Sequence, residues 1–342
     1  MRDLYFPMLD IKKDYSLKKH NSFLFSHKAQ FFCEVKSKEE SHEFIDFCLK
    51  KSLPISILGE GTNVVFTKDI KGGVIKISIP GKDLKGDEII VGAGENWHRT
   101  VLWTLENSLF GLENLTLIPG TAGAAPVQNI GAYGEELSSR LISLEAINTK
   151  NNELISISNS ECDFSYRDSR FRKDNDLLIT SIKLRLKKET TTNTTYISLN
   201  KFLIKDDIDP SKATPNQVCR AVNAIRTKIL PDHKKEPNVG SFFKNLILDE
   251  ESFERLKTKL VNVPFYKDPE NLSFKVPVAF LIEQAGWKGK KIGKVRVSHK
   301  HALVLITDEN AESEDLTNFA SLIIEDIYNK HGVKLEIEPN IF

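Results

Sequence analysis

The stretch PGTAGAAPVQNIGAYG, residues 119–134, is the part of the sequence that decides the fold. It is rich in glycine and alanine and contains no charged residue. Because its apolar residues follow neither the helical nor the strand period, it predicts an extended loop packed against another part of the chain. Glycine has no Cβ, so backbone N–H groups in this loop can approach a phosphate closely. A pyrophosphate bound by amides alone would explain why the loop needs no lysine.

A second glycine loop lies in ILGEGTNVVF, residues 57–66. Gly59 and Gly61 begin the G-x-G-x-x-G pattern of a Rossmann dinucleotide site, but Val64 stands where the third glycine belongs, which disfavours that fold. Taken alone, this segment favours a tight turn. Together with the uncharged loop 119–134 it favours a backbone phosphate cradle, and a pair of plain turns is the alternative.

Length and charge limit the class of protein. The chain has 342 residues, too many for one comfortable core, which predicts two or three domains. Lys and Arg number 48 against 47 Asp and Glu, so the overall charge indicates neither a nucleic-acid partner nor a membrane surface. No apolar run reaches signal-peptide length or the ~20 residues of a transmembrane helix. The four cysteines form no CxxC pair, so we expect free thiols and a cytoplasmic protein.

Local patterns predict a mixed α+β architecture with a domain boundary near residues 190–212. Ser37 and Glu40 form a capping box for a helix over residues 37–51, and PISIL after it reads as a short buried strand. The polar segment KKETTTNTTY, residues 187–196, predicts an exposed loop or hinge. A further helix begins at Thr214, a C-terminal helix ends at Gly332, and VKLEIE follows as a strand. We expect domains at 1–195, with subdomains of about 1–75 and 76–195, and at 212–342.

Three other features have a structural and a functional interpretation. His98 could attach a flavin or bind a metal, but no metal-binding residue lies at ligand spacing, which favours a histidine at a strand–helix junction. The segment VGSFF is not a serine-hydrolase elbow, because Phe243 replaces the second glycine. Residues 284–307 contain six Lys or Arg and no Asp or Glu, which indicates either a solvated rim or a surface for a multiply charged small molecule.

The ordered motifs of the chain resemble the UDP-N-acetylenolpyruvoylglucosamine reductase family. The resemblance runs from about Ser16 to the C-terminus, and Tyr196 in the polar loop is similar to the longer, first type of the family. Each motif alone is weak, whereas their order is specific. The motifs are ILGEGTNVVF, GAGENWH, GLENLTLIPGTAGAAPVQNIGAYGEE, FSYRDSRF, GSFFKN, LIEQAGWKG, HALVLI and LEIE.

The resemblance implies a fold and a reaction. The expected fold is an FAD domain of the vanillyl-alcohol-oxidase (PCMH) kind with a smaller C-terminal α+β substrate domain. The expected reaction is NADPH-dependent reduction of the enol ether in UDP-N-acetylglucosamine enolpyruvate to UDP-N-acetylmuramate, for peptidoglycan synthesis. FAD would be bound non-covalently, no metal is expected, and the protein would act as a monomer without nucleic acid or membrane. The FAD contacts implied are Gly59, Gly61, Thr62, Asn63, Gly120, Gly123, Ala124, Gln128, Asn129, Gly131 and Ala132.

The resemblance also implies catalytic roles for three residues. Arg167 would stabilise the carboxylate as negative charge develops, Ser241 would donate a proton, and Glu338 would assist as a protonated or proton-sharing group. From the residues alone, each favours a plainer interpretation. Arg167 would form a surface ion pair, Ser241 would be a turn serine, and Glu338 would lie on the solvated face of a strand. The implied substrate or nicotinamide contacts are Tyr133, Tyr166, Tyr196, Arg226, Lys228, Asn245 and His301.

Two departures from the family pattern concern these contacts. Lys228 lies one position earlier than the family lysine, and the chain after Glu338 reads Pro-Asn-Ile-Phe and lacks an arginine. Two other functions fit the same flavin fold: an FAD oxidase of a small alcohol, and a flavin- or nucleotide-sugar-binding protein without turnover. Reoxidation by oxygen would indicate the oxidase, and ligand binding without reaction would indicate the binding protein.

Overall fold

The computed structural model describes residues 9–267 and 272–342, and the chain divides into two compact units. The first unit comprises Met1–Ser16, Lys28–Gly61 and Asp69–Arg226, and the second comprises Leu17–His27, Thr62–Lys68 and Thr227–Phe342. Residues 1–8, at the start of the predicted first domain, lie outside the described residues. The domain limits expected from the sequence, 1–195 and 212–342, stay a prediction.

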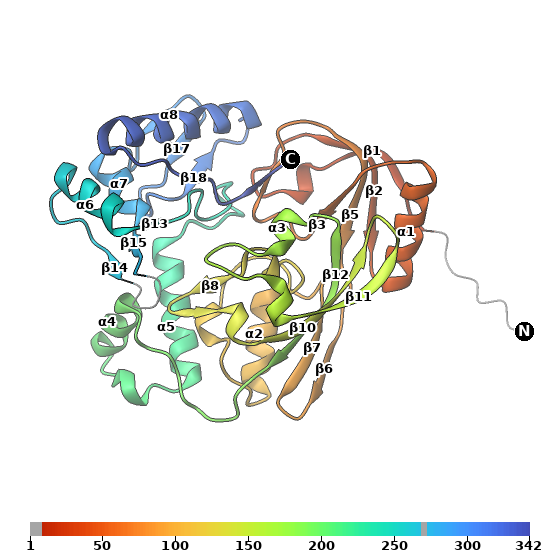
Figure 1. Cartoon of the computed structure of the whole chain (residues 1–342), viewed down its shortest axis with the longest axis horizontal. Coiled ribbons are helices and arrows are strands. Elements are labelled where there is room, and N and C mark those ends of the chain that lie inside the picture. The colour runs from red at the N-terminus through yellow and green to blue at the C-terminus, as the bar shows by residue number, and fades with distance from the viewer. Residues whose placement is uncertain (1–8, 268–271) are drawn as a thin grey trace, which may run out of the picture. The chain divides into compact units, whose positions relative to one another are not determined.

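A mixed four-stranded sheet opens the first unit, in the order β1-β2-β5-β3 (Figure 1). The strands β2 (Lys28–Val35) and β3 (Ile55–Leu58) both run parallel to β5 (Ile70–Ile77), and β1 (Lys12–Ser16) runs antiparallel to β2. Helix α1 (Lys38–Lys50) connects β2 to β3 and buries Phe44 and Ile45. Parallel strands need such a crossover, so the predicted helix and the predicted strand PISIL are both confirmed.

The second sheet of the first unit is antiparallel throughout, in the order β11-β10-β12-β7-β6. Its longest strand, β12, alternates little and is buried along most of its length, as expected for a strand covered on both faces. The strands of this sheet are β6 (Lys82–Lys85), β7 (Glu88–Gly92), β10 (Leu141–Asn148), β11 (Glu153–Ser158) and β12 (Leu177–Arg185). The α-helices between residues 97 and 229 are α2 (Trp97–Glu106), α3 (Arg170–Lys173), α4 (Ile197–Lys205) and α5 (Pro215–Ile229).

The capping chemistry predicted for two helices is present. The Ser37 side chain accepts a hydrogen bond from the Glu40 N–H, while the Glu40 carboxylate accepts from the Lys36 N–H, one residue earlier than an ideal capping box. At α5, the Thr214 hydroxyl accepts from the Gln217 N–H at 3.3 Å, and the Gln217 side chain accepts from the Thr214 N–H at 2.8 Å. These local signals fixed both helix starts as the sequence predicted.

Within the residues that the structure describes, the second unit contains small sheets and the α-helices α6 (Glu250–Lys259), α7 (Val278–Gln284) and α8 (Ser313–His331). Helix α8 buries one apolar stripe and ends at Gly332 in a left-handed conformation, which confirms the predicted terminator. Strands β4 (Val64–Val65) and β19 (Asn340–Ile341) pair in parallel within this unit. The remaining strands are β13 (Leu246–Leu248), β14 (Tyr266–Lys267), β15 (Phe274–Val276), β16 (Lys291–Ile292), β17 (Val295–Val297) and β18 (Leu305–Thr307).

Two predicted segments differ in the structure. The loop 119–134 includes a 3-10 turn, η3 (Ala125–Gln128), and a two-residue strand, β8 (Gly131–Ala132), so it is not wholly irregular. The segment 333–338 is no regular strand, because it pairs with the chain only through an isolated bridge between Phe243 and Ile337. The alternation of buried Leu335 with exposed neighbours is present nevertheless.

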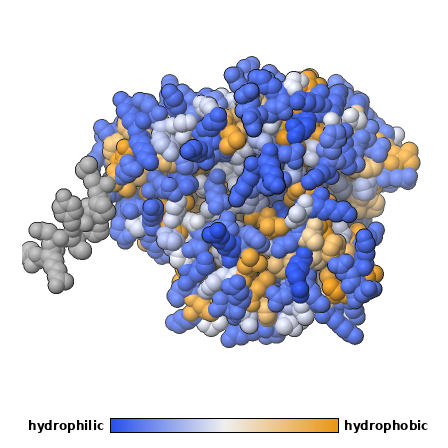
Figure 2. Space-filling model, turned by 180° about the vertical axis from the view of Figure 1, so that it is seen from behind, coloured by the Kyte–Doolittle hydropathy of each residue, from blue (hydrophilic) through white to orange (hydrophobic). Residues whose placement is uncertain are grey.

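Each unit has its own apolar core. Figure 2 shows one face, on which hydrophilic residues predominate and apolar side chains form small groups. All four cysteines are free and buried, and burial raises the pKa of Cys33 and Cys162 to about 12, so these thiols are unreactive. Among residues 9–267 and 272–342, no helix has the length and apolarity needed to cross a membrane.

Candidate active site

The two glycine loops of the first unit lie against each other. A Cβ on Gly59 would stand 3.2 Å from Thr121 Oγ1 and 3.5 Å from Ala124 Cβ, so the two loops are in close contact there. Gly61 and Gly120 both have left-handed backbone angles, with φ of 71° and 115°. The N–H groups of Gly59, Gly61 and Gly120 donate no hydrogen bond within the part of the chain that the structure describes. These amides are therefore available to an anion, as the cradle interpretation predicted.

Arg167 is held close to the glycine loop by a strained backbone. It adopts a left-handed conformation, φ 54°, in the turn between Ser165 and Asp168. Its Nη2 donates to the Gly131 carbonyl at 2.6 Å, and a Cβ on Gly131 would lie 3.1 Å from Arg167 Nη1. The guanidinium also stacks over the Tyr166 ring, with 5.4 Å from Cζ to the ring centroid. Gly131 therefore makes the close approach of this arginine possible.

Arg226, on α5, is a second guanidinium of the first unit. Its Nε atom is shielded from solvent and has no hydrogen-bond partner among the described residues. Burial lowers the pKa of Arg226, the nearby Tyr133 opposes this shift, and the Arg167 charge adds to it. A half-buried cation with a shielded, unused donor is costly, so this arrangement fits an anionic group supplied by a ligand.

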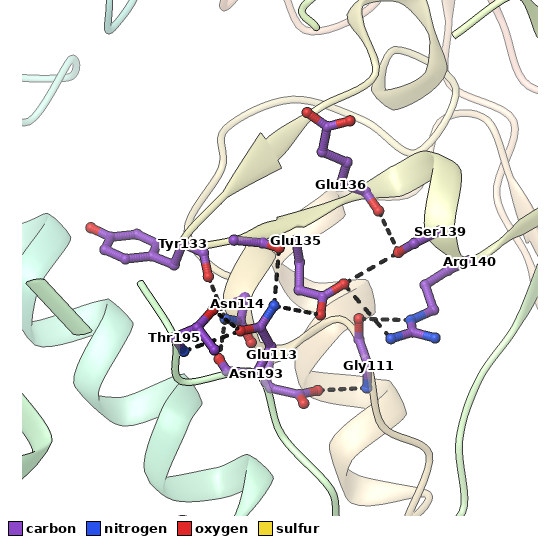
Figure 3. A network of polar contacts seen from close by, with 11 residues as sticks. Gly111, Glu113, Asn114, Tyr133, Glu135, Glu136, Ser139, Arg140, Asn193 and Thr195 are labelled. Atoms are coloured by element: carbon purple, nitrogen blue, oxygen red, sulfur yellow. Dashed lines mark hydrogen bonds and ion pairs between the residues drawn. The ribbon is translucent and has the colours of Figure 1, made fainter. Parts of the chain in front are cut away.

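Tyr133 and Tyr196 form an aromatic pair in the same unit. Their ring centroids are 5.3 Å apart in an edge-to-face arrangement. Tyr133 is buried and left-handed, with φ 50°, whereas Tyr196 is half-exposed and directly precedes α4. Burial raises the pKa of the Tyr133 hydroxyl and Arg226 opposes that shift, so the hydroxyl stays protonated at neutral pH. Figure 3 shows Tyr133 at the edge of a polar network that includes Asn114 and Asn193.

Backbone hydrogen bonds of the next residue, Phe242, hold the segment that carries Ser241 in the second unit. The Phe242 N–H donates to the Leu303 carbonyl at 2.7 Å, and the Phe242 carbonyl accepts from the Glu338 N–H at 2.9 Å. The Ser241 hydroxyl itself has no hydrogen-bond partner within residues 9–267 and 272–342. Gly240 before it has φ 76° and open space where a Cβ would be, so its glycine serves the turn.

The backbone bond from Glu338 brings the predicted proton donor and the predicted catalytic glutamate onto neighbouring segments of one unit. Glu338 is half-buried and makes an interaction of its own, whereas Glu336 is exposed and pairs with Lys244 at 2.6 Å. Phe242 and Phe243 are fully buried in the core of the second unit and pack edge to face. Packing of these two rings in the core therefore anchors the segment that carries Ser241.

The remaining predicted substrate contacts are distributed over the second unit. Asn245 Oδ1 accepts from the Val278 N–H at 3.1 Å, at the start of α7. His301 Nδ1 accepts from the Leu303 N–H at 3.2 Å, so Nδ1 carries no proton. Lys228 is exposed. The basic stretch is largely neutralised, because Lys288, Lys291, Lys294 and Arg296 all pair with carboxylates.

Comparison with known proteins assigns the family. The family model described as the C-terminal domain of UDP-N-acetylenolpyruvoylglucosamine reductase matches residues 232–342, and the one described as an FAD binding domain matches residues 29–158. The UDP-N-acetylenolpyruvoylglucosamine reductase of Flavobacterium johnsoniae is 40% identical over 341 residues, which cover 97% of this chain and 100% of that protein. This chain belongs to the UDP-N-acetylenolpyruvoylglucosamine reductase family. The reductase of Burkholderia multivorans is 37% identical, over 97% of each chain.

Solved structures agree with the predicted fold class of this reductase. The crystal structure of the reductase from Thermus caldophilus superposes with a TM-score of 0.68 at 20% identity, covering 98% of this chain and 100% of that one. A 6-hydroxy-D-nicotine oxidase from Arthrobacter nicotinovorans superposes with a TM-score of 0.57 at 11% identity, covering 98% and 88%, and shares the fold alone. The prediction of an α+β flavoprotein fold with a family-specific C-terminal domain is confirmed.

The residues of the reductase fit FAD. The unused amides of Gly59, Gly61 and Gly120 lie within the part matched as an FAD binding domain. Other predicted contacts bond internally: the Asn129 Nδ2 donates to Glu136 at 2.8 Å and its Oδ1 accepts from the Ser138 N–H, while the N–H groups of Gly123 and Ala124 donate to the Ala93 and Thr121 carbonyls. Gln128 and Ala132 are half-buried beside Asn129, and Thr62 and Asn63 belong to the second unit.

Sequence reasoning missed some residues of the reductase that organise the site. His98, treated as a junction histidine, accepts the Leu117 N–H at 3.2 Å and contacts Thr116 at 3.0 Å, just before the glycine loop. Asn114 and Asn193 connect the two tyrosine-bearing loops. Asn114 lies inside the family motif GLENLTLIPG, but nothing in the sequence distinguishes it from a turn residue. Among the described residues no cluster could hold a metal ion.

Proposed function

We propose that this protein is the NADPH- and FAD-dependent reductase of UDP-N-acetylglucosamine enolpyruvate, with UDP-N-acetylmuramate as product for peptidoglycan synthesis. The family membership supports the substrate and the cofactors. The observation that supports the chemistry is the Ser241 hydroxyl, which is half-buried, fixed by backbone bonds and without a partner in the described chain. A polar group kept in this state is available for a reaction.

The chemistry that bound FAD supplies is hydride transfer, from NADPH to the terminal methylene carbon of the enol ether. In our proposal the amides of Gly59, Gly61 and Gly120 hold its pyrophosphate, because they are unused by the described chain and because Gly61 and Gly120 lie in left-handed turns. Close packing of Gly123 against Ala93, where a Cβ would meet another Cβ at 2.5 Å, keeps the second loop in place.

Arg167 and Arg226 are proposed to bind the negative groups of the substrate. Addition of a hydride to the methylene carbon leaves negative charge on the adjacent carbon and its carboxylate. A guanidinium binds such an oxyanion with two parallel hydrogen bonds and stays charged. We assign the carboxylate to Arg167, because its group is fixed by Gly131 and Tyr166, and assign a second anionic group to Arg226.

Ser241 is proposed to donate the proton that completes the reduction. The acceptor is the carbon next to the carboxylate, which carries carbanion character once the hydride has added. A hydroxyl is a weak acid in water, but a strong base held at contact distance makes the transfer favourable, and positioned donors contribute ~10²–10⁴-fold. The two backbone bonds of the adjacent Phe242 fix the segment that carries Ser241, so its hydroxyl needs no large motion.

Glu338 is proposed to act as a proton-sharing partner near the developing charge. An ionised carboxylate would repel an enolate, so the role requires a protonated or hydrogen-bonded carboxyl. Its half-buried position and the bond from its N–H to the Phe242 carbonyl support this assignment. We further propose substrate or nicotinamide contacts for Tyr133, Tyr166, Tyr196, Lys228, Asn245 and His301, a cytoplasmic location and a monomeric state.

An anaerobic titration tests the proposed function. The purified protein should show the flavin spectrum, lose it when NADPH is added, and regain it only when UDP-N-acetylglucosamine enolpyruvate follows. Recovery with that substrate in the absence of oxygen requires both half-reactions. Recovery with oxygen alone would instead support an FAD oxidase, and binding without any bleaching would support a protein that does not turn over.

A further inference from the structure

We propose that Asn193 is a positioning residue of this enzyme: together with Asn114 it fastens the loop that carries Tyr196 against the loop that carries Tyr133. We call Asn114 and Asn193 the asparagine clasp. The clasp lies wholly in the first unit, and its hydrogen bonds appear in Figure 3. The inference rests on the proposed function only in giving the two tyrosines a substrate to contact.

Asn193 uses both ends of its amide. Its Nδ2 donates to the Gly134 carbonyl at 3.0 Å and to Glu135 Oε1 at 3.2 Å, on the loop after Tyr133. Its Oδ1 accepts from the Thr195 N–H at 3.1 Å and from the Thr195 hydroxyl at 2.7 Å, on its own loop. One side chain therefore orders the chain before Tyr196 and connects it to the neighbouring loop.

Asn114 is the second residue of the clasp. Its side chain is 1% exposed, and its Nδ2 donates at 2.8 Å both to the Tyr133 carbonyl and to the Asn193 carbonyl. An amide NH₂ has two donors, and here each serves one of the two tyrosine-bearing loops. No aspartate or leucine of the same size could replace it, because neither has a donor.

The backbone geometry of Gly134, whose carbonyl accepts a hydrogen bond from Asn193, supports the same role. Gly134 has φ 87°, and a Cβ there would stand 3.2 Å from Asn193 Nδ2. The position therefore accepts only glycine without displacing the Asn193 amide. The result of these contacts is the 5.3 Å edge-to-face contact of Tyr133 with the half-exposed Tyr196. Without the clasp, an exposed ring on a polar loop would have many other positions open to it.

Kinetics of a double-mutant cycle test whether Asn193 acts through Tyr196. Asn193→Ala in the FAD-loaded enzyme should raise KM for the enol ether about tenfold, the size of one lost well-placed hydrogen-bonded contact, and leave kcat within about twofold. If Asn193 works only by placing Tyr196, Tyr196→Ala with Asn193→Ala should have the same kinetics as Tyr196→Ala alone. Effects that multiply would overturn the positioning role.

Amide hydrogen exchange tests the clasp without reference to activity. Peptides that span residues 192–200 should exchange faster in Asn193→Ala and in Asn114→Leu than in the wild-type holoenzyme, while peptides from β10 and β12 stay unchanged. Ser139→Ala is the matched control, because Ser139 bonds to the same Glu135 carboxylate but not to the Tyr196 loop. Unchanged exchange in both clasp variants, or equal acceleration in the control, would refute the proposal. A wild-type enzyme without turnover would refute the proposed function alone, since exchange still decides the clasp.

Discussion

Side-chain contacts position the region around Tyr133 in the first unit, whereas backbone hydrogen bonds position the region around Ser241 in the second. Near Tyr133, the left-handed residues Asn129, Tyr133 and Arg167 are held by amide and guanidinium groups. Near Ser241, the Phe242 N–H bonds to Leu303 and the Phe242 carbonyl bonds to Glu338. The difference affects what a substitution does, because removal of the Asn129 or Arg167 side chain alters geometry in the first region, whereas removal of the Ser241 hydroxyl leaves the backbone bonds of the second region intact.

The comparison also separates two kinds of functional group. In the first unit the groups available to a ligand are cations and backbone amides, which bind negative charge. Around Ser241 the group without a partner among the described residues is a neutral hydroxyl, which can move a proton. We therefore expect substitutions in the first region to change binding and geometry, and substitution of Ser241 to change a chemical step alone.

The largest effect is expected from Ser241→Ala. Loss of the proton donor should lower the rate of transfer to the enol ether by ~10²–10⁴-fold, while the rate of flavin bleaching by NADPH stays within about twofold. The backbone bonds around residue 241 do not involve the hydroxyl, so the melting temperature should be unchanged. Anaerobic stopped-flow absorbance measures both half-reactions. Full turnover in the variant would show that Ser241 is not the proton donor. The second region would then not differ from the first by supplying a chemical step.

The next effect in size is expected from Arg226→Met. Loss of a charged hydrogen-bonding partner should raise KM for the substrate by ~10–100-fold, equal to about 1.5–3 kcal/mol. The same change removes a shielded cation whose Nε has no partner in the described chain, so stability should stay equal or rise. Urea unfolding of the apoprotein, alongside steady-state kinetics, measures both. A large loss of stability with unchanged KM would show that Arg226 is structural.

A smaller effect is expected from Gly131→Ala, which tests how far side-chain packing controls the first region. The added Cβ would lie 2.9 Å from Glu136 Cγ, 3.0 Å from the Glu135 carbonyl and 3.1 Å from Arg167 Nη1. Since the carbonyl cannot retreat easily, Arg167 should move, lowering kcat/KM about tenfold and stability by about 1–3 kcal/mol. Steady-state kinetics and flavin content check this, and wild-type kcat/KM would show that Arg167 needs no such placement.

The sequence predicted the elements that local chemistry determines. The capping boxes at Ser37 and Thr214 and the terminator Gly332 define helix ends in the structure, because each depends on residues a few positions apart. The glycine loops were recognised for the same reason, since left-handed turns need glycine. The strand expected at 333–338 was wrong: alternation alone does not show whether a pairing partner exists.

The candidate site depended more on the family resemblance than on local signals. Without it, Ser241 read as a turn serine and Arg167 as a surface ion pair, because their contacts come from chain segments far away in sequence. Asn193 lay in a segment interpreted as a plain polar loop, since hydrogen bonds across 59 residues leave no trace in a single sequence. Assignments of the site residues stay predictions that the experiments above test.

The smallest effect concerns a buried histidine outside the site, where neither side chains nor backbone satisfy the group. His331 on α8 is 8% exposed, and both ring nitrogens are shielded without a hydrogen-bond partner in the described chain. Burial lowers its pKa, Lys330 adds to the shift and Asp326 opposes it. As pH falls, the unfolded chain therefore binds a proton before the folded one, so protonation of this histidine costs nothing at pH 8 and lowers stability as pH falls below about 6.5.

His331→Leu should remove this pH dependence. At pH 8 the variant should be equal to or up to about 1–3 kcal/mol more stable than the wild type, since an unsatisfied donor is replaced by an apolar side chain. Its advantage should grow at pH 5.5. The free energy of unfolding in urea at both pH values checks this, with His42→Gln as a control, because His42 has a hydrogen-bond partner in Asn152. An advantage that is equal at both pH values would mean that protonation of His331 does not limit stability, and that only its unsatisfied donor matters.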